Sequence, residues 1–558
     1  EKRLRDIIVS EENKFWKFLT RNTILNTSNI ELDVRLLENY YKSLGYYDVK
    51  ILSNSAVIDE TGAELIYNIS AGKRYKVTKV STNISDALDK KVFLTLNKDF
   101  EKVVGDFYSP FKIKNLLDEL DRLINFNDLQ FIEHSVNEIV SNDGIEVIIN
   151  IFEGRKNLVE RINIYGNSIT NEDVIRSELL LDEGDPFNNL KLDQSIAKLR
   201  SKDIFATVKK EVKVGSEPDL QIIDITIEEK PTGEISAGAG VGSDGGTVQV
   251  GIKENNWLGT GVNLSSFLEV NDTSVKGNIE YKNPNFNYTG NSLNFNAGVL
   301  TNDQLTVSGY KNDMISLGAS TDFEQFTNIY IQPGVFISSD DLSVDDTASN
   351  LLKKQAGTFN EFGFDYQIRR DERDKVFMPT KGYVASFYQS LPLVSDASSI
   401  RNTIAIANYK SFGEDIVGSL KFYASAVNGL DDDVRISKRI FLPSNRLRGF
   451  KTRKVGPLDG SDYVGGNYAS AINLEANLPN LLPDSTKADV SLFFDAANLW
   501  GVDYNSGMDD SNEIRSSVGL NTSWLSPIGP LTFTFSKEVT KADTDQTQGF
   551  KFNLGTTF

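Results

Sequence analysis

The sequence predicts an α+β N-terminal part followed by an all-β transmembrane barrel of 16 antiparallel strands. Two observations lead to this fold class. A pattern of one amphipathic helix and two strands recurs three times before residue 231, and from there to residue 558 apolar and polar residues alternate. Helices bury one face with a period of about 3.6 residues and strands with a period of 2, so the two parts have different architectures.

The N-terminal part contains three tandem α+β domains, at residues 1–73, 74–156 and 157–230. A repeat of this length exceeds the roughly 20–50 residues of a solenoid unit, which indicates small domains that each have a core. The second and third domains begin with a strand but the first begins in a helix, so we expect the first to be incomplete, with its N-terminal strand missing. The predicted helices carry apolar faces at Leu37, Tyr40, Tyr41 and Leu44, at Ile113, Leu116, Leu117 and Leu120, and at Leu192, Ile196 and Leu199.

The C-terminal part, residues 231–558, reads as about sixteen strands joined by connections that are alternately short and long. In residues 531–536 every second side chain is apolar, and residues 419–426 alternate in the same way. An even number of strands of about ten residues, apolar on one face, is what an outer-membrane barrel requires. Water-soluble sheets alternate too, so a soluble β-sandwich array remains an alternative; partition into detergent would distinguish the two.

Composition excludes several classes of function. The chain has 59 basic and 78 acidic residues, a net charge of −19, no cysteine and one histidine, His134. Cysteine-based catalysis, disulfide scaffolds, thiolate metal sites and two-histidine metal sites are excluded, and nucleic-acid binding is not expected from so acidic a chain. We find no nucleophile elbow and no phosphate-binding loop, so we expect neither an enzyme nor a cofactor.

One set of charged residues in the barrel part stands out. Glu475 and Asp495 lie in neighbouring predicted strands, each on the face opposite the apolar residues, so both carboxylates should point into the lumen. The long connection before them, roughly residues 429–467, carries Arg448. An arginine from a loop folded into the lumen would find bidentate acceptors there. The alternative is an external loop in which Arg448 and Gly449 are ordinary turn residues.

Several motifs resemble the BamA family of outer-membrane protein assembly factors. Residues 447–450 (LRGF) resemble that family's [V/L]RGF loop, and residues 493–500 (FFDAANLW) resemble its F-x-D-x-G-x-[VL]-W strand, with Ala497 in place of the usual glycine. Residues 256–261, 377–383 and 524–530 resemble further barrel signatures. Residues 166–170 resemble the start of a polypeptide-transport-associated (POTRA) domain, whose β-α-α-β-β pattern the tandem units match. The resemblance covers the whole chain.

The resemblance implies roles for individual residues. Arg448 of the Arg448-Gly449-Phe450 segment would lock onto Glu475 and Asp495 inside the barrel; we call these three charged residues the lumen cluster. Glu178, in a helix expected to begin near Thr170, matches the acidic position with which the family docks the lipoprotein BamD. The family has five POTRA domains, so this chain would hold roughly the last three.

The first and last predicted strands of the barrel are rich in glycine. Residues 234–242 place Gly238, Gly240 and Gly242 on the inner face, and the strand that ends at Phe558 contains Gly555, where the family shows a kink. Glycine weakens strand pairing, whereas a barrel in lipid has to pair its first and last strands. A weak seam between them could open and offer its edge to an incoming strand, because β-augmentation relies on main-chain hydrogen bonds.

The sequence therefore predicts a protein that folds β-barrel clients into the bacterial outer membrane through a lateral gate, with its POTRA domains in the periplasm. Its expected partners are unfolded client proteins, outer-membrane lipid and assembly-machine lipoproteins such as BamD. Two alternatives share the fold, a TamA-like protein and a two-partner-secretion translocation pore. A passive porin is an alternative from another class, which stable single-channel conductance would favour.

Overall fold

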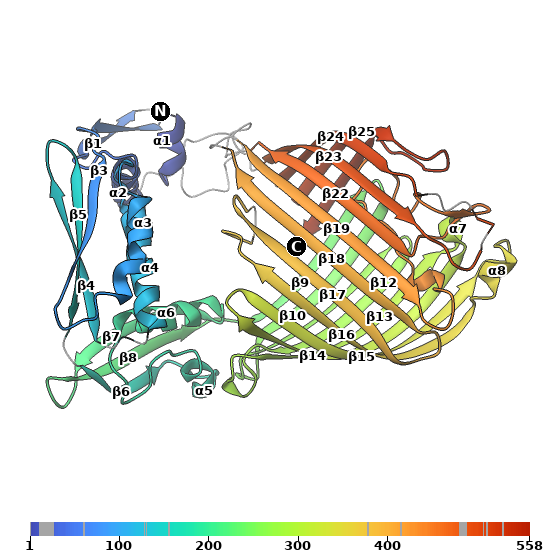
Figure 1. Cartoon of the computed structure of the whole chain (residues 1–558), viewed down its shortest axis with the longest axis horizontal. Helices are drawn as coiled ribbons and strands as arrows, with labels where there is room; N and C mark the ends of the chain where they lie inside the picture. Colours follow the sequence, from blue (N-terminus) through green and yellow to red (C-terminus); the bar gives the residue numbers. More distant parts are fainter. Residues whose placement is uncertain are drawn as a thin grey trace. The chain divides into compact units, whose positions relative to one another are not determined.

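The computed structural model describes residues 2–10, 27–59, 62–127, 129, 131–154, 157–376, 379–412, 416–478, 488–505, 507–508, 512–526 and 529–557. The chain forms two compact units, and Figure 1 shows their elements. The first unit comprises residues 1–166, 178–202 and 207–227. The second comprises residues 167–177, 203–206 and 228–558, so three short segments of the third tandem domain, the last of them residues 228–230, cluster with the barrel.

The tandem domains make up the first unit, apart from the three segments of the third domain that cluster with the barrel. The first domain has α1 (Lys2–Ile7), α2 (Thr27–Ser43), β1 (Lys50–Asp59) and β2 (Gly62–Ser70). The second has β3 (Val77–Ile84), η3 (Val92–Leu96), α3 (Asn97–Glu101), α4 (Pro110–Phe126), β4 (Ile132–Val140) and β5 (Ile145–Glu153). The third has β6 (Leu158–Tyr165), α5 (Glu172–Arg176), α6 (Asn189–Ser201), β7 (Phe205–Val214) and β8 (Leu220–Glu229).

The second and third domains share the predicted β-α-α-β-β order. Their three-stranded sheets run β3-β5-β4 and β6-β8-β7. In both, the first strand is parallel to the central strand, and in the second domain β4 is antiparallel to β5. In the second domain the periodic residues Ile113, Leu116 and Leu120 of α4 are buried, as are Ile145 and Val147 of β5. The predicted helical faces therefore form the domain core.

The second unit is a closed antiparallel barrel of 16 strands (Figure 1). This confirms the predicted fold class, and the soluble β-sandwich alternative is wrong. The barrel strands are β9 (Gly233–Gly242), β10 (Gly245–Trp257), β11 (Val262–Asn271), β12 (Ser274–Asn283), β13 (Ser292–Gln304), β14 (Tyr310–Phe326), β15 (Ile329–Val344), β16 (Gly357–Asp371), β17 (Gly382–Ser395), β18 (Ser399–Ser411), β19 (Val417–Gly429), β22 (Tyr468–Asn477), β23 (Ala488–Trp500), β24 (Arg515–Ser526), β25 (Gly529–Thr540) and β26 (Phe550–Thr557).

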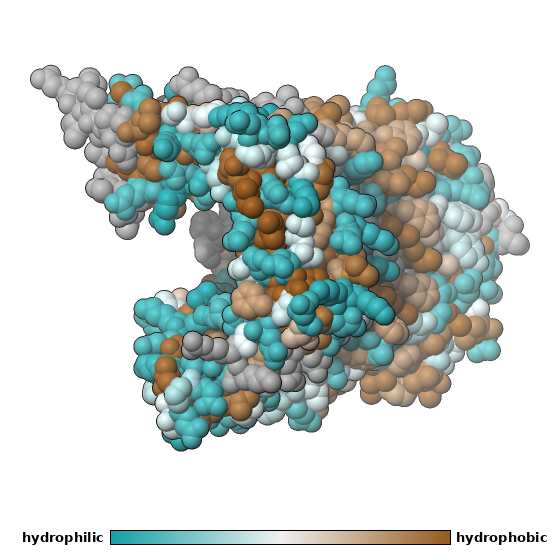
Figure 2. Space-filling view, turned by 60° about the vertical axis from the view of Figure 1, so that its left-hand side comes forward, coloured by the Kyte–Doolittle hydropathy of each residue, from teal (hydrophilic) through white to brown (hydrophobic). Residues whose placement is uncertain are grey.

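The outward-facing residues of the barrel are apolar. On β10, for example, Val248, Val250 and Ile252 are about half exposed or more (55%, 48% and 59%) although they are all aliphatic. Figure 2 shows apolar surface, coloured brown, gathered over the barrel wall. Because the strands leave one apolar face uncovered, this surface suits lipid rather than water. Among the described residues, the helices are all too short or too polar to cross a bilayer.

The connection between β19 and β22, residues 430–467, lies inside the barrel; we call it the arginine loop. It contains η5 (Ile436–Lys438) and a small hairpin of β20 (Leu458–Asp459) and β21 (Asp462–Tyr463). Ser437 donates a 2.7 Å hydrogen bond to the buried Asp340 of β15, and Lys438 forms a 2.7 Å ion pair with the buried Glu361 of β16. The loop therefore crosses the lumen and is held by inward-facing side chains of the wall.

Residues 167–177 belong to the barrel unit because they bond to the β10–β11 turn. Asn256 is buried and its amide donates a 2.9 Å hydrogen bond to Thr170 Oγ1, while the Asn171 N–H donates one of 2.8 Å to the Gly259 carbonyl. Glu229, at the end of β8, accepts hydrogen bonds of 3.0, 3.0 and 2.6 Å from the N–H groups of residues 168–170. This carboxylate orders the segment that reaches the barrel.

Candidate functional site

The arginine loop presents Arg448 from a rigid backbone. Its neighbours Leu447 and Phe450 are buried (2% and 3% exposed) in an apolar cluster that also contains Ala497. Gly449 has φ = +91°, and a Cβ there would lie 3.2 Å from the Cβ atoms of both Ser517 and Ser536. Glycine suits this position, because other residues are strained at such a φ and their Cβ would press against the wall.

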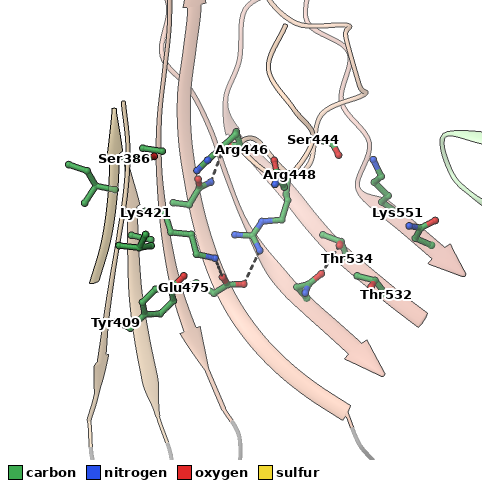
Figure 3. Close-up of a pocket in the computed structure, with 18 of the residues that line it drawn as sticks. Ser386, Tyr409, Lys421, Ser444, Arg446, Arg448, Glu475, Thr532, Thr534 and Lys551 are labelled. Carbon is green, nitrogen blue, oxygen red and sulfur yellow. Dashed lines mark hydrogen bonds and ion pairs between the residues drawn. The ribbon is translucent and has the colours of Figure 1, made fainter. Parts of the chain in front are cut away.

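Arg448 contacts both predicted carboxylates. Its Nε and Nη2 donate to the two oxygens of Asp495 at 2.8 Å each, and its main-chain N–H donates to Asp495 Oδ2 at 3.0 Å. Its Nη1 donates to Glu475 Oε1 at 3.0 Å. Figure 3 shows Arg448 and Lys421 reaching Glu475 from opposite sides. The structure thus brings the three residues of the lumen cluster together, with the geometry of a bidentate arginine–carboxylate pair.

The lumen cluster is largely shielded from water. The side chains of Arg448, Glu475 and Asp495 are 14%, 12% and 0% exposed. The Arg448 guanidinium also lies 3.7 Å from the centroid of the Phe493 ring, over its face. Because the partly buried charges are paired and hydrogen-bonded, the arrangement is stable as a set, whereas loss of one member would leave an unmatched charge.

Further polar residues complete the cluster. Lys421 forms a 3.0 Å ion pair with Glu475, and Ser491 donates a 2.9 Å hydrogen bond to the same carboxylate. Asn473 donates a 2.8 Å hydrogen bond to Asp495. Sequence reasoning missed Lys421 as a partner. The signal was available, because Lys421 stands on the inner face of β19 and Asn473, its register partner on β22, is two residues from Glu475.

Ala497, the departure from the family's strand motif, does not disturb β23. It is 3% exposed and stands in unbroken register with Ala471 on one side and Arg515 on the other. The extra methyl group therefore packs beneath the arginine loop instead of altering the strand. Phe558 and parts of two other signatures, at residues 377–378 and 527–528, lie outside the described residues.

The seam between β9 and β26 is short. Over the described residues, five register pairs join these strands, from Gly242 opposite Asn553 to Gly238 opposite Thr557. β13 and β14, by comparison, share thirteen. Gly240 stands opposite Gly555, so four of the ten paired positions in the seam are glycine. The register continues through Gly555 without a shift, and a kink at this glycine stays a prediction.

The arginine loop is bonded to both sides of the seam. The Gln548 N–H, in the connection that leads into β26, donates to the Gly449 carbonyl at 2.8 Å. Thr452 donates a 3.1 Å hydrogen bond to Asp244, in the turn that follows β9, and Lys551 of β26 forms an ion pair with the same Asp244. The residues that follow Arg448 therefore connect the lumen cluster to the strands that close the barrel.

Glu178 is not in a helix. The helix expected from near Thr170 is only α5 (Glu172–Arg176), and Glu178 lies in the turn that follows it. Its carboxylate forms a 2.8 Å ion pair with Lys202, and both side chains are about 15% exposed. The helix was expected from the family resemblance, whereas the chain turns at residues 177–178 after only five helical residues. A docking role for Glu178 stays a prediction.

Residues 256–558 match the model of the Omp85 superfamily domain, and residues 1–72 and 158–230 match that of the POTRA domain, described as a surface antigen variable number repeat. The chain belongs to the Omp85 superfamily. Both the closed barrel and the tandem domains fit an Omp85 protein, so the recognition of this barrel superfamily from sequence motifs is confirmed.

Several relatives of this Omp85 chain are named outer membrane protein assembly factor BamA. That of Neorickettsia risticii is 25% identical over 568 residues, covering 100% of this chain and 76% of the relative. That of Neisseria meningitidis serogroup B is 24% identical over 609 residues, covering 98% and 75%. The predicted location, a barrel in the bacterial outer membrane with POTRA domains in the periplasm, agrees with these names.

Solved structures show the same fold. BamA from Haemophilus ducreyi lacking POTRA domains 1–3 superposes with a TM-score of 0.65 at 21% identity, over 87% of this chain and 100% of that one. CdiB from Escherichia coli superposes with a TM-score of 0.52 at 12% identity, over 96% and 99%. At such identities the similarity concerns the Omp85 fold alone.

Proposed function

We propose that this protein folds and inserts β-barrel proteins into the bacterial outer membrane through a lateral gate between β9 and β26. The names of the relatives support a role in outer-membrane protein assembly, and the short seam between β9 and β26 is the observation that supports a lateral gate. Over the described residues of the barrel, only this seam and β25–β26 have as few as five register pairs, and of these two only the seam has glycine among its paired positions. Because glycine weakens strand pairing, the seam is the preferred place for the barrel to open.

The first barrel strand offers an edge to a client. β9 pairs along its whole length with β10, whereas its pairing with β26 ends at Gly238 in the described residues. Residues 233–236 therefore present main-chain groups on the seam side, and Ile235 is 76% exposed. Such groups are costly in lipid, so an added strand that pairs with them lowers the free energy. The added strand needs no particular sequence, because the main chain supplies the hydrogen bonds.

The proposed mechanism is mechanical. The client strand pairs with the edge of β9, the seam opens, and the growing client sheet replaces β26 as the neighbour of β9. The energy comes from strand pairing and burial in lipid, so no catalytic side chain and no cofactor takes part. Assembly-machine lipoproteins such as BamD are proposed partners of the POTRA domains, with Glu178 as a candidate contact.

A disulfide across the seam tests the gate. Val241 and Leu554 are register partners, and the chain contains no other cysteine, so Val241→Cys with Leu554→Cys yields one defined crosslink. We expect the oxidised protein, reconstituted in liposomes, to lose insertion of a barrel client and to regain it on reduction. The matched control joins Val299→Cys to Ile315→Cys, register partners in the long β13–β14 pair.

Full client insertion by the oxidised seam variant would overturn the gate. It would favour a translocation pore, which passes its substrate through the lumen and does not need the seam to open. Loss of activity in the β13–β14 control as well would instead show that any crosslink in the wall blocks insertion, which also contradicts a gate at this seam.

A further inference from the structure

A cavity of about 550 Å³ lies inside the barrel next to the lumen cluster (Figure 3). From the arginine loop, Ser444, Asn445, Arg446 and Arg448 line it. The rest of the wall comes from strands on both sides of the lumen, β17–β19 and β22 on one side and β24–β26 on the other. Residues 551–553 of β26 are part of the wall. The cavity therefore reaches the strand that closes the seam.

The charged residues around the cavity are mostly cationic. Lys421 and Arg448 are paired with Glu475, and Lys551 is paired with Asp244. Arg446 is different, because its guanidinium has no carboxylate partner in the part of the chain that the structure describes. Glu475 is the one acidic residue that lines the cavity, and it is already shared by two cations. The cavity thus carries an excess of positive charge, centred on Arg446.

Arg446 is held in place by neutral contacts. Its guanidinium carbon lies 4.8 Å from the centroid of the Tyr423 ring. Its carbonyl accepts a 3.0 Å hydrogen bond from Asn473, the residue that also donates to Asp495, and its N–H donates to the Pro443 carbonyl at 2.9 Å. Stacking on an aromatic ring leaves the edge of the guanidinium, and its fork of N–H donors, free to bind an oxyanion.

We propose that Arg446 anchors a carboxylate-binding site in the lumen, and that its ligand is the terminal carboxylate of a client strand. The inference rests on the proposed function, since the cavity borders the strand that a client would displace. An arginine fork matches the two oxygens of a carboxylate. The neutral polar residues Asn445, Asn521 and Asn553 around it can bond to a peptide main chain, and the volume holds several residues rather than one small ion.

The ligand class can be tested with a strand peptide whose only carboxylate is terminal. The sequence of residues 550–558, FKFNLGTTF, contains no Asp or Glu. We would label it at its N-terminus, prepare it as the free acid and as the C-terminal amide, and measure binding of each to the full chain in detergent by fluorescence anisotropy. We expect the acid to bind about tenfold more tightly than the amide, a difference of about 1.4 kcal/mol.

The Arg446→Gln variant should lose this preference, so that acid and amide bind equally. Lys454→Gln is the matched control, because Lys454 is in the same loop, does not line the cavity and undergoes the same change of charge. Retained heat-modifiability in gels establishes that both variants are folded. Arg446→Lys, which keeps the charge without the fork, should retain only part of the preference.

Equal binding of acid and amide to the unaltered protein would overturn the proposal. So would an acid preference that survives in Arg446→Gln or is lost in Lys454→Gln. Displacement of the acid by inorganic phosphate with no effect on the amide supports an oxyanion site, whereas displacement of both forms would show that the peptide binds elsewhere. None of these outcomes depends on insertion activity, so failure here leaves the seam crosslink as an independent test of the gate.

Discussion

At the scale of single residues, the lumen cluster shows why charges inside a barrel need complete pairing. Asp495 has no exposed surface and accepts hydrogen bonds from Arg448 and Asn473. The energy of such a set is not the sum of its contacts, because each charge is tolerated only while its partners remain. The arginine loop is therefore held in one position by a small number of groups.

Replacing Arg448 should destabilise the barrel. We expect Arg448→Ala to cost about 3–5 kcal/mol, because the fully buried Asp495 loses its cationic partner and Glu475 keeps only Lys421. Arg448→Lys should recover part of this, since a lysine supplies the charge but not the bidentate fork. The measurement is the temperature at which the folded, fast-migrating form is lost in gels. Lys454→Ala in the same loop is the control, and an Arg448→Ala variant that melts with it would show that the cluster does not hold the loop.

Glu229 should make part of the stability depend on pH. Burial alone would raise the pKa of its carboxyl, but hydrogen bonds from Ser168, Thr170 and Ile169 outweigh burial and lower the pKa from 4.5 to about 2. A lowered pKa in the folded state means that the stabilisation is complete above pH 4.5 and is lost as pH falls toward 2.

The variant Glu229→Gln should therefore be less stable than the unaltered protein at pH 7, by about 1–3 kcal/mol. The difference between the two should shrink as pH falls through the window from 4.5 to about 2. Urea unfolding followed by tryptophan fluorescence measures both. Glu217→Gln, at an exposed position, is the control and should change neither value. A Glu229→Gln difference that stays constant with pH would contradict the role of its ionised form.

At the scale of elements, β9 and β26 depend on glycine for their close approach. A Cβ on Gly242 would lie 2.8 Å from the Phe552 carbonyl oxygen, so the strands would have to separate. A Cβ on Gly246 of β10 would meet only the Gly240 carbonyl, at 4.0 Å. Replacement by alanine should therefore disturb the seam at Gly242 but not at Gly246, although the two glycines are four residues apart.

Gly242→Ala should loosen the seam. In the background of Val241→Cys with Leu554→Cys, we expect it to slow disulfide formation several-fold, because the cysteines spend less time in register. Gly246→Ala should leave the rate unchanged. Faster crosslinking in Gly242→Ala would mean that glycine at this position weakens the seam by flexibility alone and not by allowing close approach.

At the scale of the whole molecule, much of the architecture could be predicted because each part repeats a simple period. Alternation gave the barrel strands, since one face of each meets lipid, and it also placed Glu475 and Asp495 on the same inner surface. Arg448 was matched to them through the resemblance of residues 447–450 to the BamA-family loop motif, because the same loop carries other arginines that periodicity cannot tell apart. Three features could not be predicted from periodicity.

Those features depend on contacts between distant segments. Glu178 lies in a turn because α5 stops after Arg176, and the residues that bond this region to the barrel, such as Asn256, are far away in sequence. The length of the seam depends on register, which a glycine-rich strand does not encode in its side chains. That Arg446 has no carboxylate partner among the described residues becomes clear only after Lys421, Arg448 and Lys551 have each been assigned to a carboxylate.

The bonds between the arginine loop and the segment leading into β26 affect how the barrel can open. The Gly449 carbonyl accepts a hydrogen bond from the Gln548 N–H, and the Gln546 carbonyl accepts one of 2.8 Å from the Lys451 N–H. The segment that leads into β26 is therefore hydrogen-bonded to the arginine loop. A client that displaces β26 outward therefore also pulls on the arginine loop. Opening should therefore be cooperative: β26 and the arginine loop move together once the force exceeds a threshold, and the register pairs of the seam do not break one at a time.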